Sequence, residues 1–142
     1  MRAFTVALLW VAVGGMAAYW AFFFTYLPGA VWDPGFISFE RAFPPADAVL
    51  AASAALTAEL LRRQRPTAVP MGLFAAGQFC FLGALGATYN LQHGGYTLTP
   101  AGVSELAVNV YCLALAGWLA VYLWGSRHRL DAGVYSGSIT AG

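Results

Sequence analysis

Long apolar segments separated by short polar ones occupy almost the whole chain. Four of them are predicted to cross a membrane as helices, at about residues 3–26, 43–61, 67–91 and 101–124. A helix of about 20 residues spans a hydrocarbon core of ~30 Å. Backbone groups inside a bilayer must pair within their own segment, which excludes open-edged strands. The pattern predicts an all-α, polytopic membrane protein, an antiparallel bundle of four transmembrane helices in one domain over residues 1–125.

The two longest segments outside these helices differ in character. Residues 27–45 combine the prolines and glycines typical of turns with large apolar side chains such as Trp32 and Phe36. A loop surrounded only by water would carry fewer such side chains, so we expect a lid on the membrane surface, over the outer end of the bundle. Residues 126–142 are polar and are predicted to form a mostly disordered cytoplasmic tail.

Composition supports the membrane assignment. Hydrophobic residues make up 60% of the chain and charged residues 9%, whereas a soluble domain carries ~25% charged residues. No basic face supports binding of nucleic acid, and no glycine-rich phosphate motif is present. Membrane lipids are the expected surroundings.

The arginines indicate an orientation. Only Arg41 lies in a loop predicted to face outside, and the other six lie elsewhere: Arg2, Arg62, Arg63, Arg65, Arg127 and Arg129. The positive-inside rule then places both termini in the cytoplasm, and the first segment reads as a retained helix in the inner membrane. The absence of lysine and the many alanines are typical of a bacterial genome rich in GC. Glu59 is spaced to pair with Arg62 or Arg63.

Polar side chains gather at the predicted outer end of the bundle, which suggests a polar pocket under the lid, because such groups within membrane spans are costly and often functional. Glu105 and Asn109 share one helix face through their i,i+4 spacing. A buried Glu105 would stay protonated and serve as a general acid; alternatively it is ionised at the interface and pairs with Arg41 or water. Asp47 is a second candidate acid, although a carboxylate in a first helical turn also complements the helix dipole.

Seven side chains are predicted to contact a ligand in this pocket: Asn109, Asn90, His93, Glu40, Gln78, Trp32 and Tyr89. Gln78 is alternatively a hydrogen-bond partner between helices, and His93 a solvated loop residue. The two histidines, His93 and His128, are predicted on opposite sides of the membrane, and no group has metal-ligand spacing. We therefore expect neither a metal nor a cofactor.

The third segment is rich in small residues. Gly83 and Ala87 have the spacing that allows another helix to approach closely, within the bundle, in a second copy or in a partner protein. Cys80 and Cys112 form no CxxC motif and are expected to be packing residues. Thr99 followed by Pro100 predicts the start of the last helix.

A set of short motifs resembles the YvaD-like small four-span bacterial membrane proteins. In that family a Tyr-Trp pair near the end of the first span precedes a loop, and an aromatic-Pro-x-Asp sequence opens the second span. The corresponding residues here are Tyr19-Trp20, Pro28, Asp33-Pro34, Phe43-Pro44-Pro45-Ala46-Asp47 and Asn109-x-Tyr111. The resemblance covers about residues 15–125, although the second proline and the glycine-rich loop depart from it. It implies the four-span topology and adds weight to Asp47 and Asn109, but it assigns no reaction.

Three classes of function follow from these residues. The first is a membrane protein whose polar pocket in the outer leaflet binds a lipophilic or amphipathic small molecule. The second is an intramembrane isomerase or cyclase acting on a lipid or isoprenoid-like substrate, with Glu105 or Asp47 as the acid; it requires two carboxylates at one closed cavity. The third is an accessory subunit that docks through the small residues of the third segment. Binding is favoured because no carboxylate lies deep in a span.

Overall fold

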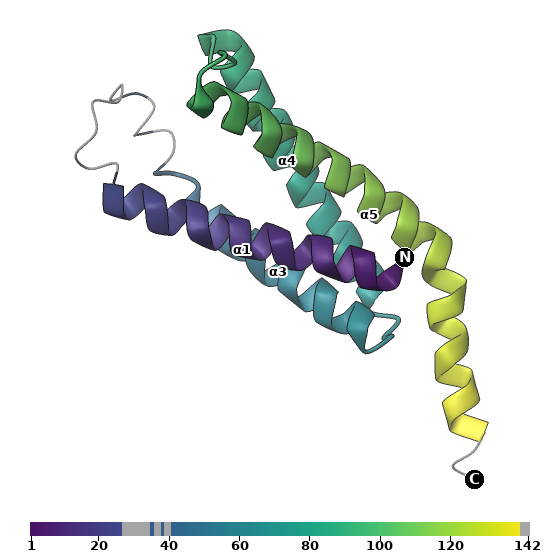
Figure 1. The fold of residues 1–142 in the computed structure, drawn as a ribbon. Coiled ribbons are helices and arrows are strands. Elements are labelled where there is room, and N and C mark those ends of the chain that lie inside the picture. Colours follow the sequence, from purple (N-terminus) through teal and green to yellow (C-terminus); the bar gives the residue numbers. More distant parts are fainter. Residues whose placement is uncertain (27–34, 36–37, 39–40, 140–142) are drawn as a thin grey trace. The chain divides into compact units, whose positions relative to one another are not determined.

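The computed structural model describes residues 1–26, 35, 38 and 41–139, with side chains as far as residue 128. Helix makes up 87% of this part and no strand occurs in it, so the prediction of an all-α fold is confirmed. The helices are α1 (Arg2–Tyr26), α3 (Pro44–Arg62), α4 (Ala68–His93) and α5 (Pro100–Ile139) (Figure 1).

The prediction of four membrane-spanning helices is wrong. Within the described residues, three helices are long and apolar enough to cross a membrane, over Arg2–Thr25, Ala68–His93 and Pro100–His128. The remaining helix, α3, has 19 residues, begins with two prolines and includes two acidic residues. Alanine supplies much of the rest of α3, and its methyl group is only weakly apolar compared with a leucine side chain. The segment 43–61 therefore has the length of a span without the required hydropathy.

The number of spans also changes the predicted topology. The chain is a multi-pass membrane protein, because it carries three helices of sufficient length and hydropathy. With three such helices in the described residues, the prediction that four crossings bring both termini to the cytoplasm loses its basis.

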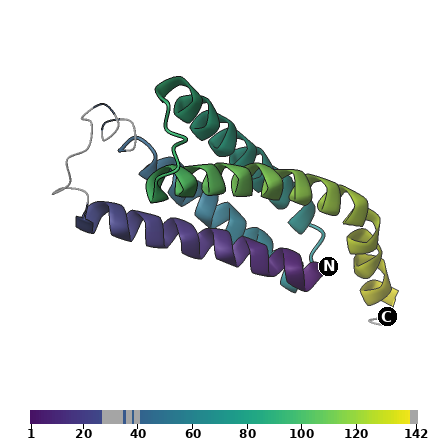
Figure 2. The ribbon, with the colours of Figure 1, turned by 45° about the horizontal axis from the view of Figure 1, so that its top comes forward.

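Residues 1–63 form the first compact unit, an antiparallel hairpin in which α1 packs along α3 (Figures 1 and 2). Its buried apolar side chains include Leu9 on α1, and Leu50, Ala54 and Ala58 on α3. The alanines of α3 are spaced four residues apart on one face, which allows α1 to lie close to that face.

Residues 64–142 form the second unit, in which α4 packs along α5. A Cβ atom added at Gly83 would lie 2.9 Å from Cγ of Leu113 and 3.1 Å from Cβ of Cys112, and one added at Gly86 would lie 2.4 Å from Oδ1 of Asn109. The small residues of α4 thus allow a close helix contact, as predicted, and within this unit the neighbouring helix is α5. Cys112 is buried, Cys80 is exposed, and the two form no disulfide with each other.

A short turn joins α4 to α5. Gly94 ends α4 with a φ of 64°, a left-handed conformation that favours glycine, and the amide of Gly95 donates to the carbonyl oxygen of Asn90 at 2.8 Å. The hydroxyl of Thr99 accepts a hydrogen bond from the amide of Gly102 at 3.2 Å, which caps the first turn of α5. The predicted start of the last helix at Thr99 and Pro100 is confirmed.

The C-terminal segment differs from its prediction. Helix α5 continues as far as Ile139, where a mostly disordered tail was expected from residue 126. Residues 126–139 contain no proline, and extending an existing helix costs far less than starting a new one. A helix of 40 residues is about 60 Å long. It therefore exceeds the thickness of a bilayer core, and its last turns lie beyond the span.

Candidate functional site

Four polar side chains lie together at the end of the second unit where α4 turns into α5, and we call them the turn cluster: Asn90, Tyr96, Glu105 and Asn109. The side-chain amide of Asn90 donates to the carbonyl oxygen of Gly86 at 2.9 Å and to Oε2 of Glu105 at 3.4 Å. Nδ2 of Asn109 donates to the hydroxyl of Tyr96 at 2.9 Å. These bonds tie the end of α4 and the turn to the first turns of α5.

Burial makes these hydrogen bonds important. Asn90 and Asn109 are only 7% and 6% exposed, whereas Glu105 is half-buried. A buried amide without a partner costs roughly 1–3 kcal/mol. In the described part of the chain, no buried side-chain nitrogen or oxygen lacks a hydrogen-bond partner. The two amides are therefore fixed in place, and they in turn fix Glu105 and Tyr96.

The acidic group of the turn cluster has a neutral partner. Glu105 accepts its hydrogen bond from the amide of Asn90, and among the described residues it forms no ion pair. Its i,i+4 neighbour Asn109 lies on the same face of α5, as the spacing predicted, and both contact the α4 side of the hairpin or the turn. The arrangement presents a partly accessible carboxylate that can accept hydrogen bonds from a bound molecule.

Two more of the predicted ligand contacts lie next to the turn cluster. The rings of Tyr89 and His93 stack with their centroids 4.2 Å apart, and Nδ1 of His93 lies 2.9 Å from the carbonyl oxygen of Tyr89. His93 is exposed at the end of α4. Gln78 is half-buried on α4 and lies about 18 Å along the helix from Asn90, so it is separate from the cluster. Trp32 and Glu40 lie outside the described residues.

The other predicted acid belongs to the first unit. Asp47 is 9% exposed, and its Oδ2 accepts a hydrogen bond of 2.9 Å from Nε1 of Trp20, which joins α3 to α1. Burial raises the pKa of the Asp47 carboxyl, and the hydrogen bond from Trp20 acts in the opposite direction. The Trp20 ring is held by edge contacts with Tyr19 and Phe23, at centroid distances of 5.1 and 5.2 Å. Asp47 and Glu105, the two predicted catalytic carboxylates, thus belong to different units.

Sequence reasoning missed Trp20 and Tyr96. A signal for Trp20 was available, because the indole N–H of a buried tryptophan needs an acceptor. Helix α1 contains no acid, so a carboxylate acceptor had to come from another part of the chain. Tyr96 lies in a turn, where no periodicity indicates the direction of a side chain.

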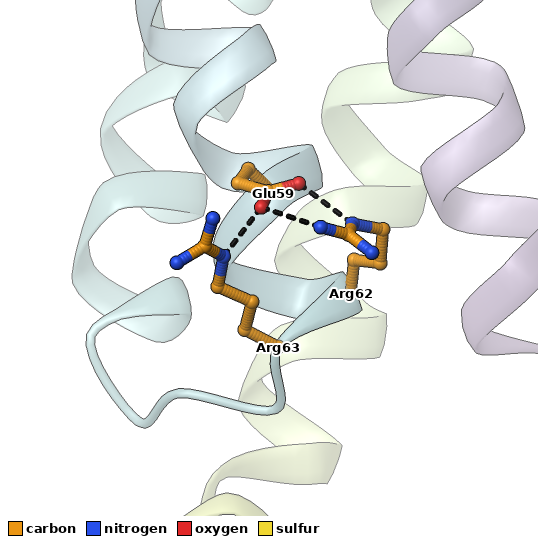
Figure 3. Close-up of polar contacts among 3 residues, drawn as sticks. All are labelled: Glu59, Arg62 and Arg63. Atoms are coloured by element: carbon orange, nitrogen blue, oxygen red, sulfur yellow. Dashed lines mark hydrogen bonds and ion pairs between the residues drawn. The ribbon is translucent and has the colours of Figure 1, made fainter.

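Glu59 forms a separate group with two arginines at the end of α3 (Figure 3). Its carboxylate accepts from Arg62 at 2.7 and 2.8 Å and also from Arg63. The predicted pairing with these arginines is confirmed. The hydrogen bonds from Arg62 and Arg63 lower the pKa of Glu59 to about 2.

The lowered pKa of Glu59 predicts a small loss of stability in acid. The unfolded chain binds this proton more readily, so the stabilisation is complete above the ordinary pKa of 4.5 and disappears as the pH falls through about 2. The effect should be slight, because the group is exposed to solvent. We expect the thermal unfolding temperature of the wild type to fall more steeply than that of Glu59→Gln as the pH is lowered from 4.5 to about 2. Parallel profiles would contradict the assigned ion pairs.

Neither a search for metal ligands nor a comparison with known proteins narrows the function. Among the described side chains, no group of three or more His, Cys, Asp and Glu is placed to hold a metal ion. The chain matches no protein-family model, no curated protein and no solved structure. The resemblance to YvaD-like proteins therefore stays a prediction.

Proposed function

We propose that the protein binds a small amphipathic molecule at the turn cluster. The observation that carries the proposal is the pair of buried amides, Asn90 and Asn109, which hold a partly exposed carboxylate and a tyrosine hydroxyl in fixed positions. Hydrogen bonds between helices would account for the two amides but not for the partly exposed carboxylate beside them, and polar groups near membrane spans are costly and often functional. Sites held by fixed neighbours lose little entropy when a ligand binds.

The surroundings of the turn cluster support an amphipathic ligand. Leu91 is one residue beyond Asn90, Leu106 follows Glu105, and Leu98 lies in the turn, and all three side chains are exposed. An apolar chain bound to these leucines would lie within reach of the polar groups of the cluster. Most ligand sites combine apolar surface with a few fixed polar groups in this way. We place this activity in the cytoplasmic membrane of a bacterium, in keeping with the lysine-free, alanine-rich composition.

The proposal is tested by native mass spectrometry and lipid extraction of the full chain, purified gently from its own membrane. We expect one co-purifying small molecule with the wild type. Asn109→Leu keeps a similar side-chain size but cannot hold Tyr96, and it should lose that molecule. Val110→Leu, an exposed neighbour on the same helix, should retain it.

The other outcomes separate the alternatives. Bulk phospholipid alone in all three samples would contradict the proposal. A stoichiometric protein partner in place of the small molecule would favour an accessory subunit. Conversion of the bound molecule by the wild type, abolished in Glu105→Gln, would favour the intramembrane enzyme.

A further inference from the structure

Glu105 is the one formal charge at the turn end of the second unit within residues 64–128. The cationic side chains of this part of the chain are Arg65, before α4, and Arg127, near the far end of the α5 span. Arg127 lies about 33 Å along α5 from Glu105 and stacks over the ring of Trp124 at 4.3 Å. At such distances these arginines do not neutralise Glu105 across water, because salt screens charges within about 8 Å.

A second half-buried carboxylate of the chain, that of Glu59, is paired directly with cationic side chains. Glu59 contacts two arginines, whereas the partner of Glu105 is a neutral amide at 3.4 Å. A half-buried carboxylate in a membrane protein is stabilised by an opposite charge, and charges removed from water are generally paired. No arginine of residues 64–128 lies at this end, and a bound cation would supply the opposite charge.

The hydrogen-bonding capacity of the turn cluster leads to the same conclusion. The two N–H groups of the Asn90 amide are used, one toward Gly86 and one toward Glu105, and the amide of Asn109 donates to Tyr96. A carboxylate accepts several hydrogen bonds, and Glu105 receives one. One N–H of Asn109 and the hydroxyl proton of Tyr96 remain as donors, so the cluster can both donate and accept. The discrimination comes from the carboxylate of Glu105, which attracts a cation and repels a phosphate, sulfate or carboxylate.

We infer that the turn cluster selects an amphipathic molecule with a positively charged head, such as an alkyl ammonium, placed against Glu105. The inference rests on the proposed function and names the ligand class of the same site. The half-buried ring of Tyr96, which belongs to the cluster, is of the kind that attracts ammonium groups. The exposed leucines Leu91 and Leu98 would contact the alkyl chain.

The test compares three probes that share a ten-carbon chain: decyltrimethylammonium, decanol and decanesulfonate. Binding is measured by equilibrium dialysis against the full chain in nanodiscs of phosphatidylcholine, with empty nanodiscs subtracted. We expect one saturable site per chain for the cation, about tenfold tighter than for the alcohol, which corresponds to about 1.4 kcal/mol. The sulfonate should bind most weakly.

Variants assign the preference to Glu105. Glu105→Gln keeps an acceptor for Asn90. It should weaken binding of the cation about tenfold and leave binding of the alcohol unchanged. Glu59→Gln removes the same charge from a carboxylate that already has two arginine partners, and it should alter neither probe. Glu105→Asp keeps the charge and should retain the preference for the cation. Equal binding of the cation by wild type and Glu105→Gln, or a preference for the sulfonate, would overturn the inference.

The design also separates this inference from the proposed function. Suppose that the cation and the alcohol bind equally well, and that Asn109→Leu weakens the binding of both probes. The site then exists, and only its selectivity for a charged head is refuted. If no probe binds above the empty nanodiscs, the binding function itself is contradicted. Circular dichroism of each variant shows whether its helices have formed.

Discussion

Gly86→Ala is expected to destabilise the α4–α5 hairpin by about 1–3 kcal/mol, even though alanine is the better helix former. The new methyl group would lie 2.4 Å from Oδ1 and 3.2 Å from Cγ of Asn109. That side chain has little freedom to move away, because it is buried and its amide is bonded to Tyr96. Either the helices separate or Asn109 loses Tyr96, and both outcomes cost stability.

The measurement is unfolding in mixed micelles with increasing dodecyl sulfate, followed by circular dichroism. Gly77→Ala is the matched control on the same helix, because the added methyl group would meet nothing within 4 Å apart from the adjacent backbone of α4 itself. It should be neutral or slightly stabilising. Combining Gly86→Ala with Asn109→Ala removes the side chain that clashes, so the double variant should lose less stability than the two single variants added together. Strict additivity would contradict the contact between Gly86 and Asn109.

Trp20→Phe is expected to cost the first unit about 1–3 kcal/mol, since it leaves the buried carboxyl of Asp47 without its hydrogen-bond donor. Asp47→Asn keeps an acceptor for the indole N–H but carries no charge. The penalty for Trp20→Phe should therefore be smaller when Asp47→Asn is already present. The same unfolding experiment on the four proteins of this cycle gives the coupling between the two side chains.

The Asp47 pair also predicts a dependence on pH of opposite sign to that of Glu59. Burial raises the pKa of Asp47, so the folded protein binds this proton more tightly than the unfolded chain. The favourable contribution is complete below the ordinary pKa of 3.8 and is lost as the pH rises through the raised value. Asp47→Asn should remove this slope. A wild type and Asp47→Asn with the same dependence on pH above 3.8 would contradict the burial of the carboxyl.

The helices of this protein were predictable because apolar length is a strong signal. Helices α1, α4 and α5 follow the expected segments, although α5 extends much further than expected. The failure at residues 43–61 has a definite cause: counting alanine as apolar gives α3 the pattern of a span, whereas its prolines, Asp47 and Glu59 lower its hydropathy. A count of apolar positions does not separate these cases, because it gives a methyl group the weight of a leucine side chain.

The candidate site was predictable only along single helices. The i,i+4 spacing of Glu105 and Asn109 placed them on one face of α5, and Asn90 followed from its position at the end of the preceding helix. The bonds from Asn109 to Tyr96 and from Trp20 to Asp47 depend on the path of a turn and on the rotation of one helix about another. Neither quantity is encoded in the periodicity of a single segment.

The short turn between α4 and α5 has a consequence for biogenesis. Residues 94–99 are too few for the two helices to move far apart, so we expect the pair to enter the bilayer as one hairpin. The amides of Asn90 and Asn109 would then reach Glu105 and Tyr96 during insertion, before either helix exposes them to lipid alone. Lengthening this turn would let α4 insert before α5. In that intermediate the amide of Asn90 would keep its bond to Gly86 within α4 but would lack Glu105.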